Sequence, residues 1–157
     1  YVENDIHDEN NDYGISKSLG ELYDNCTIIR TSIIGEETKN KYSLLEWIKS
    51  NKDGSINGYT NHYWNGVTCL QLAKILFQII DTNNFWNGVR HIFSPNILSK
   101  YELSMLINTT YNLNITINKH ETEKYINKSL NTICDENAVF NIPELHQQIL
   151  ALKDFTI

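Results

Sequence analysis

The chain contains few cysteines and none of the patterns that give cysteine a structural role. Its three cysteines, Cys26, Cys69 and Cys134, lie far apart and include no C-x-x-C pair. Neither a zinc site nor a framework of paired disulfides is therefore indicated, no metal site is predicted, and a reducing cytoplasm is the compartment that fits. We expect the three thiols to lie in the interior as small hydrophobic side chains.

Long apolar runs and basic runs are also missing. No positively charged start precedes an apolar segment, and no window approaches the roughly 20 apolar residues of a membrane span, so neither a targeting signal nor a membrane anchor is predicted. The net charge of -6 and the lack of a basic cluster disfavour nucleic acid as the main partner. With 157 residues, 41% of them hydrophobic, the composition is typical of one soluble globular domain.

Hydrophobic periodicity predicts an α/β chain. Apolar residues spaced by three and four predict helices, and short β-branched or alternating runs predict strands. In chain order we expect a surface loop over 1–12, a helix over 13–23, a strand over 27–34, helices over 42–50 and 70–80, a strand over 89–93, a helix after Ser99, a short strand over 114–118 and a final helix from Pro143 to Leu152. This order predicts a partly parallel sheet with flanking helices, in which 27–34 is a buried strand.

Several helix boundaries carry recognisable capping residues. The cluster Asn10-Asn11-Asp12 can supply the cap of the first helix. In a capping box, a hydroxyl and a side chain three residues further on satisfy each other's backbone amides. Three more boundaries are predicted in this way: capping boxes at Thr68 and Gln71 and at Ser99 and Glu102, and Pro143 in the first turn of the last helix.

Near the start of the chain, a tyrosine and a lysine share one helical face. Tyr13 and Lys17 are four residues apart, so the ammonium can lie one turn from the phenol. A phenol is a poor acid or base at neutral pH, but a cation at about 5 Å in an effective dielectric of about 20 favours the phenolate by roughly 3 kcal/mol. Such a pair suits proton donation to a carbonyl oxygen while hydride from a nicotinamide reaches the carbon, and the lysine can also hold ribose hydroxyls of that cofactor.

The residues around this pair resemble a known family. Tyr13-Gly14-x-Ser16-Lys17-x-x-Gly20-Glu21, followed by a β-branched strand ending Arg30-Thr31-Ser32-x-x-Gly35, resembles the active-site helix and following strand of the extended short-chain dehydrogenase/reductases. Asn65-Gly66-Val67-Thr68, followed by Leu72-Ala73, resembles the sugar-nucleotide contact segment of the branch around dTDP-4-dehydrorhamnose reductase. The resemblance implies a Rossmann-like fold, NADP or NAD as cofactor, and a nucleotide-sugar substrate in surface-polysaccharide biosynthesis.

The resemblance also implies roles for individual residues. Tyr13 would be the proton donor and Lys17 its partner, both in contact with the cofactor. At the carboxyl end of the following strand, the residues beside the nicotinamide would be Thr31, Ser32 and Ile33. The sugar nucleotide would be bound by Tyr42, Ser43, Tyr59, Trp64 and Asn65. Rhamnose-type reductases usually carry a tryptophan where this chain has Ile33, which leaves the exact 4-keto sugar open.

One part of the family's pattern is missing from the sequence. The seven glycines show no G-x-x-G-x-x-G spacing, the turn that receives the pyrophosphate of a dinucleotide. We therefore expect residues 1–157 to be a single C-terminal fragment, with the catalytic helix and following Rossmann strand in 1–35 and a mainly substrate-binding region in 36–157. The missing N-terminal half would be the partner that binds most of the cofactor, and the fragment alone would be inactive.

Other functions remain open beside the reductase. A sugar-nucleotide epimerase or dehydratase would use bound NAD without net redox change. A non-enzymatic relative would bind dinucleotide without turnover, and the Tyr-Lys pair could also be fortuitous in an unrelated α/β domain. The choice between NAD and NADP, and the oligomeric state, including a possible homodimer, stay open.

Overall fold

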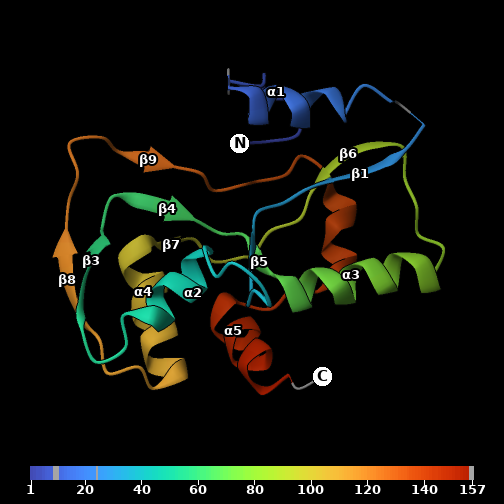
Figure 1. The fold of residues 1–157 in the computed structure, drawn as a ribbon. Coiled ribbons are helices and arrows are strands. Elements are labelled where there is room, and N and C mark those ends of the chain that lie inside the picture. Colours follow the sequence, from blue (N-terminus) through green and yellow to red (C-terminus); the bar gives the residue numbers. More distant parts are fainter. Residues whose placement is uncertain (9–10, 24, 156–157) are drawn as a thin grey trace.

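The computed structural model describes residues 1–8, 11–23 and 25–155 (Figure 1). Asn10 of the expected capping cluster lies outside these residues. The elements are α1 (Asp12–Leu19), β1 (Thr27–Arg30), β2 (Ile33–Ile34), α2 (Leu44–Ser50), β3 (Ser55–Tyr59), β4 (His62–Trp64), β5 (Val67–Thr68), α3 (Cys69–Asp81), β6 (Gly88–His91), β7 (Leu98–Ser99), α4 (Lys100–Tyr111), β8 (Thr116–His120), β9 (Ile126–Asn127), the 3-10 helix η1 (Asp135–Phe140) and α5 (Leu145–Asp154).

Most strand pairs are parallel. β1 pairs with β6, β2 with β5, β3 with β8 and β4 with β9, all in parallel, whereas β7 runs antiparallel to β4. Parallel neighbours need long crossover connections, and the helices between these strands supply them. The predicted α/β chain with a partly parallel sheet and flanking helices is therefore confirmed, although the short strands β3, β4, β5, β7 and β9 were not predicted.

The single buried strand predicted over 27–34 is wrong in two respects. It is divided into β1 and β2, because β1 follows β6 while β2 turns to β5. Between them, the Ser32 carbonyl accepts a hydrogen bond from the Val67 amide at 2.9 Å, which draws the chain toward β5. The four residues of β1 are only partly buried, since β6 is the one strand that pairs with β1 among the described residues.

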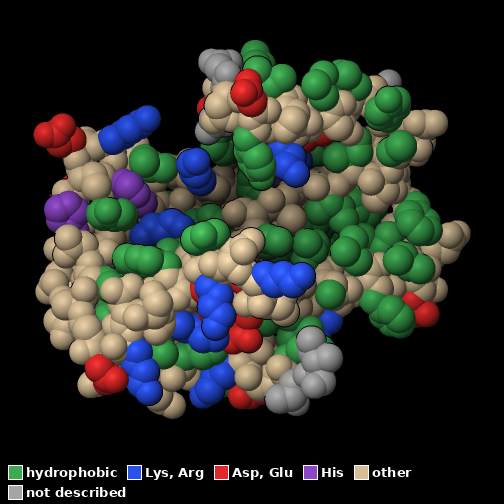
Figure 2. Space-filling view, in the orientation of Figure 1, with side chains coloured by type: hydrophobic (Ala, Val, Ile, Leu, Met, Phe, Trp, Pro, Cys, Tyr) green, Lys and Arg blue, Asp and Glu red, His purple; other side chains and the backbone are tan. Residues whose placement is uncertain are grey.

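Helix α1 lies at the top of the view in Figure 1, apart from the other helices. The Asn11 side chain caps it by accepting a hydrogen bond from the Gly14 amide at 2.8 Å, as the capping cluster predicted. The apolar positions that predicted this helix do not reach a core: Ile15 is 49% exposed and Leu19 58% exposed. Figure 2 accordingly shows hydrophobic side chains on the outer surface at this end of the molecule. Packing within the described residues therefore leaves an apolar face of α1 uncovered.

The remaining helices bury their apolar faces in two clusters. The larger cluster joins α2, α4 and α5 through fully buried residues such as Leu45, Leu103 and Ile149. The smaller cluster lies beneath β6 and contains Ile79 of α3 together with Ile92. Among the described helices, none has the length and apolar character needed to cross a membrane. The two clusters hold the strands whose ends form the site described below.

Two predicted helix starts differ from the structure. Ser99 and Glu102 form the predicted capping box of α4, but at α3 only the Thr68 hydroxyl acts as predicted. The Thr68 amide instead donates to Gln148 Oε1 at 3.0 Å. The Gln148 amide group also donates to the Pro143 carbonyl at 2.6 Å, and Pro143 precedes the Glu144 cap of α5 rather than lying in its first turn. At Thr68, a buried side chain from the distant helix α5 thus replaces the local partner.

The prediction of buried thiols is also wrong in part. Cys26 is exposed, and Cys69 and Cys134 are partly buried. Cys26 lies just before β1, whereas Cys69 packs at the edge of the larger cluster. All three cysteines are free, so no disulfide constrains the described residues.

Candidate active site

A cavity of about 350 Å³ lies where the β1–β2 segment, the start of α2, β4, β9 and the start of α4 meet. This volume is in the range of small-molecule sites. Four residues that were expected to bind cofactor or substrate line it together, and they come from three of these segments: Ser32, Ile33, Ser43 and Trp64. Segments up to about thirty residues apart in the sequence therefore converge on one cavity.

Trp64 forms a fixed wall of this cavity. Its side chain is 7% exposed, and the indole Nε1 donates to Ser32 Oγ at 2.7 Å. Gly66 allows the two segments to approach, because a Cβ at this position would overlap the Ser32 carbonyl oxygen and the Trp64 ring. An indole from β4 therefore lines the cavity beside Ile33.

Lys100 brings a positive charge into the same cavity. It is the first residue of α4, directly after the Ser99 cap, and its ammonium lies 5.9 Å from the centroid of the Trp64 ring. Burial lowers the pKa of the Lys100 ammonium, and the charge of Lys128 lowers it further. Lys128, which follows β9, also lines the cavity. The site therefore contains two cations that repel one another.

Tyr13 and Lys17 lie on one face of α1, as their spacing predicted. The Lys17 ammonium is 5.4 Å from the centroid of the Tyr13 ring. Neither residue lines the 350 Å³ cavity, and the Tyr13 side chain is 72% exposed. Water screens the interaction between the phenol and the ammonium at such an exposed position. The phenolate is therefore stabilised by the expected roughly 3 kcal/mol only when a ligand or another part of the protein excludes this water.

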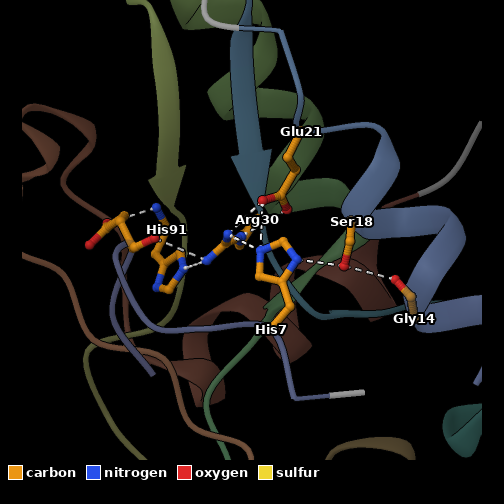
Figure 3. A network of polar contacts seen from close by, with 7 residues as sticks. His7, Gly14, Ser18, Glu21, Arg30 and His91 are labelled. Carbon is orange, nitrogen blue, oxygen red and sulfur yellow. Dashed lines mark hydrogen bonds and ion pairs between the residues drawn. The ribbon is translucent and has the colours of Figure 1, made fainter. Parts of the chain in front are cut away.

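A polar network holds α1 and its flanking residues against β1 (Figure 3). After α1, Glu21 accepts two hydrogen bonds from Arg30 of β1, at 2.8 and 2.5 Å, and these bonds lower the pKa of the Glu21 carboxyl. His7 lies between Ser18 Oγ, at 2.5 Å, and the Glu21 carboxylate, at 3.1 Å. Behind Arg30, the fully buried His91 ring contacts the Asn131 carbonyl at 2.8 Å. The position of Tyr13 and Lys17 therefore depends on charge pairing more than on apolar burial.

Glu3 ties the first residues of the chain to this network. Its carboxylate accepts hydrogen bonds from the His91 amide at 2.9 Å, the Thr132 hydroxyl at 2.6 Å and the Ile133 amide at 2.9 Å. Partial burial acts to raise the pKa of Glu3, but these hydrogen bonds outweigh it and lower the pKa from 4.5 to about 2. The ionised carboxylate therefore stabilises the folded state.

We expect Glu3→Gln to lower the free energy of unfolding by about 1–2 kcal/mol at neutral pH, after allowance for solvent screening. Because the folded-state pKa is depressed, this stabilisation is complete above 4.5 and is lost as the pH falls toward about 2. Urea unfolding at neutral and acidic pH should therefore show the wild type and Glu3→Gln converging in acid. The exposed residue Glu123 gives the control, Glu123→Gln, and an equal loss in that variant would contradict the assignment.

The other predicted site residues lie outside the cavity lining. Tyr42 is 87% exposed, and Tyr59, 38% exposed, packs against the His62 ring with centroids 4.7 Å apart. Thr31 directs its hydroxyl to the neighbouring Ser32 carbonyl at 3.5 Å. Asn65 is 2% exposed, and its amide group bonds the backbone of Ser94 and Leu130. In this structure the Asn65 side chain therefore clamps two loops together.

Lys100 and Lys128 line the cavity but were not among the expected site residues, and His62 and Tyr63 were expected there only as part of the segment 59–65. His62 and Tyr63 lie within the aromatic stretch 59–64, which offered a local signal. Lys100 was recognisable as the first residue of a capped helix, but its approach to Trp64 depends on the packing of α4 beside β4. Within the described residues, no group of three or more His, Cys, Asp or Glu side chains could hold a metal ion.

Neither a protein-family model nor a curated protein sequence matches this chain. Solved structures do match it. The fold is the Rossmann-like α/β fold of solved structures such as a dTDP-4-dehydrorhamnose reductase and a dTDP-glucose 4,6-dehydratase, so the expected fold is confirmed. The chain spans a little more than half the length of the structures it matches.

In particular, the structure is similar to dTDP-4-dehydrorhamnose reductase from Clostridium acetobutylicum, with a TM-score of 0.76 and 17% identity over 98% of this chain and 59% of that chain. The same enzyme from Bacillus anthracis, in complex with NADP, gives a TM-score of 0.74 and 17% identity over 98% and 58%. A UDP-glucuronic acid 4-epimerase from Bacillus cereus, in complex with NAD, gives 0.68 and 12% identity over 98% and 53%. These likenesses define the fold, while the reaction depends on the site.

Proposed function

We propose that this chain supplies the proton donor and most of the substrate site of a nicotinamide-dependent reductase. Its substrate would be a nucleotide-linked 4-keto-6-deoxy sugar, used in surface-polysaccharide or nucleotide-sugar biosynthesis. The observation that carries the proposal is the Tyr13–Lys17 pair on one face of α1, with the ammonium 5.4 Å from the ring centroid. The likeness of the fold to dTDP-4-dehydrorhamnose reductases supports the choice of reaction. Three free cysteines support a cytoplasmic location.

In the proposed reaction, Tyr13 donates its phenolic proton to the carbonyl oxygen of the sugar. Lys17 stabilises the phenolate that remains, and the donors of its ammonium suit the hydroxyls of a ribose. Bound NADP(H) or NAD(H) would supply the hydride that reaches the carbonyl carbon. The exposure of Tyr13 fits this role, because the phenol is accessible to a ligand.

We assign the nicotinamide side of the site to Thr31, Ser32 and Ile33, and the sugar-nucleotide side to Tyr42, Ser43, Tyr59, Trp64 and Asn65. Of these, Ser32, Ile33, Ser43 and Trp64 line one cavity, which supports placing the nicotinamide side and the sugar-nucleotide side next to one another. Asn65 would act indirectly, by holding the loops beside Trp64. Residues 1–35 then carry the catalytic helix and its following strand, and residues 36–157 mainly bind substrate.

We further propose that another part of the enzyme binds most of the dinucleotide and packs against α1. Two observations support this. The apolar side chains of α1 are exposed, and this chain covers about three fifths of the length of the solved reductase from Clostridium acetobutylicum. Packing at α1 would also exclude water from Tyr13 and Lys17, which strengthens their electrostatic coupling.

The reaction can be tested with the complete gene product, a panel of nucleotide-linked 4-keto-6-deoxy sugars, and NADPH or NADH. We expect oxidation of one equivalent of reduced nicotinamide for each sugar converted, and no turnover by residues 1–157 alone. The readouts are nicotinamide absorbance and identification of the sugar product. Sugar conversion without net consumption of reduced cofactor would contradict the reductase and favour an epimerase or dehydratase. The likeness to a UDP-glucuronic acid 4-epimerase supports this alternative. Dinucleotide binding without any conversion would favour a regulatory relative.

A further inference from the structure

Helix α1 has three faces that differ in chemistry. Tyr13 and Lys17 form one face, and the exposed apolar side chains form a second. A third face contains Gly14 and Ser18, with Glu21 just past the end of the helix, because these three positions are spaced by four and three residues. None of the residues of α1 is buried. Apolar burial within the described residues therefore does not fix the orientation of α1, and the polar third face can do so.

Arg30 of β1 fixes one end of this polar face. Its Nε and Nη2 donate to the two carboxylate oxygens of Glu21 at 2.8 and 2.5 Å, and its Nη1 donates to the Glu3 carbonyl at 3.2 Å. Hydrogen bonding to Glu21 raises the pKa of the Arg30 guanidinium, so this group stays protonated and can only donate. A helix that is held only at its end can still pivot about that point.

His7 supplies a second point of attachment, nearer the middle of α1 (Figure 3). Arg30 Nη2 lies 2.5 Å from His7 Nε2, and because the guanidinium is the donor, Nε2 must accept. This geometry assigns the ring proton to Nδ1, which donates to Ser18 Oγ at 2.5 Å. The Ser18 hydroxyl in turn donates to the Gly14 carbonyl at 3.1 Å. A chain of hydrogen bonds therefore runs from β1 to the residue next to Tyr13.

The neighbouring Glu21 carboxylate agrees with this assignment of the ring proton. Glu21 Oε2 lies 3.1 Å from His7 Nε2, and both atoms accept from the same Arg30 Nη2 group. A proton on Nε2 would instead meet the Arg30 donor at 2.5 Å. The neutral ring with its proton on Nδ1 therefore satisfies all of these contacts, and its two nitrogens connect Arg30 to Ser18.

We propose that His7 is a positioning residue for the proton donor: together with Ser18, it sets the orientation of α1 and thereby the direction of the Tyr13 phenol. This role rests on the proposed function, in which Tyr13 is the donor, and adds the residue that orients it. His7 acts through Ser18 and takes no part in proton transfer. Because a misplacement of about 1 Å can lower the rate of a chemical step by roughly 100-fold, a contact behind the helix can control turnover without touching the substrate.

The kinetic test uses the complete gene product with NADPH or NADH and the panel of nucleotide-linked sugars described above. We expect His7→Phe and Ser18→Ala each to lower kcat by about 10- to 100-fold, with a KM close to that of the wild type. The double variant should lose no more activity than either single variant, because both changes break the same chain of bonds.

Two substitutions far from α1 give the matched controls. His146→Phe changes a histidine of α5 whose side chain is 57% exposed. Ser50→Ala removes a hydroxyl of α2 that, like that of Ser18, donates to a carbonyl of its own helix, at 2.7 Å. Both control variants should retain the activity of the wild type, and equal kcat values in these controls and in His7→Phe would overturn the positioning role.

Two amide replacements distinguish the ring nitrogens of His7. Asparagine places its amide nitrogen about where Nδ1 lies and can still donate to Ser18, whereas the longer glutamine reaches the position of Nε2 and contacts only Arg30. His7→Asn should therefore retain most of the kcat, and His7→Gln should lose it as His7→Phe does. Alanine is a good helix former, so Ser18→Ala should keep a Tm close to that of the wild type. Equal losses of kcat in His7→Asn and His7→Gln, with a lowered Tm in both, would assign His7 to folding alone and overturn the positioning role.

Amide hydrogen exchange over residues 12–19 gives a readout that needs no substrate. Exchange of these amides should be about 5- to 10-fold faster in His7→Phe and Ser18→Ala than in the wild type, and unchanged in Ser50→Ala. If the wild type oxidises no cofactor but both variants show this faster exchange, the anchoring of α1 by His7 stands and the reductase is rejected. If the wild type is active and both variants keep its kcat, the reductase stands and the positioning role is rejected.

Discussion

Replacing Tyr13 with phenylalanine in the complete gene product should lower kcat for reduction of the sugar nucleotide by about 10²- to 10⁴-fold. The substitution removes only the phenolic oxygen, which is the proposed donor of the proton to the carbonyl. Tyr13 is 72% exposed and packs into neither hydrophobic cluster, so the folded state should be unaffected. Steady-state kinetics should show the loss in kcat, with a KM close to that of the wild type.

Tyr23 provides the matched control for this experiment. It lies shortly after α1, is 64% exposed, and has no proposed role, so Tyr23→Phe should retain full activity. Lys17→Met should lower activity as Tyr13→Phe does, because the phenolate would lose its stabilising charge. Turnover by Tyr13→Phe at the wild-type rate would show that another group donates the proton, and would remove the observation on which the proposed function rests.

Replacing Gly66 with alanine should destabilise the protein by about 3 kcal/mol. A Cβ at this position would overlap the Ser32 carbonyl oxygen, which is backbone and cannot turn away as a side chain would. The same carbonyl accepts the hydrogen bond from the Val67 amide at 2.9 Å, and the Gly66 carbonyl accepts one from Ser94 Oγ at 2.6 Å. Relief of the overlap therefore requires β2 and β5 to separate.

Gly20 provides the comparison for Gly66. It ends α1 in a right-handed helical conformation with φ of −68°, where alanine is well tolerated, and its added Cβ would lie 3.3 Å from the Lys17 carbonyl oxygen. Gly20→Ala should therefore change the free energy of unfolding by less than about 0.5 kcal/mol. Urea unfolding followed by tryptophan fluorescence measures both variants, and similar values for Gly66→Ala and Gly20→Ala would contradict the close approach of Gly66 to Ser32.

The sequence predicted best those features that depend on residues a few positions apart. The capping box at Ser99 and Glu102 formed as predicted, because both of its partners lie within one helical turn. At Thr68 only one of the two predicted bonds formed. The Thr68 amide donates to Gln148 Oε1 of α5 rather than to the side chain of Gln71. The strand over 27–34 was predicted from its β-branched residues, but its break at Ser32 depends on β5 and β6, which lie far along the chain.

For the candidate site, the same distinction holds. The spacing of Tyr13 and Lys17 placed the phenol and the ammonium on one face of α1, because the helical repeat alone brings residues four apart together. The cavity could not be predicted in this way. No local pattern links its lining residues Ser32, Trp64, Lys100 and Lys128. They meet because the parallel strands and the helices between them place the ends of several elements side by side. The sequence by itself therefore determined the placement of Tyr13 beside Lys17, because both lie within about one helical turn. Only the tertiary structure decided that lysines line this cavity, because its lining residues are separated by up to nearly one hundred positions in the chain.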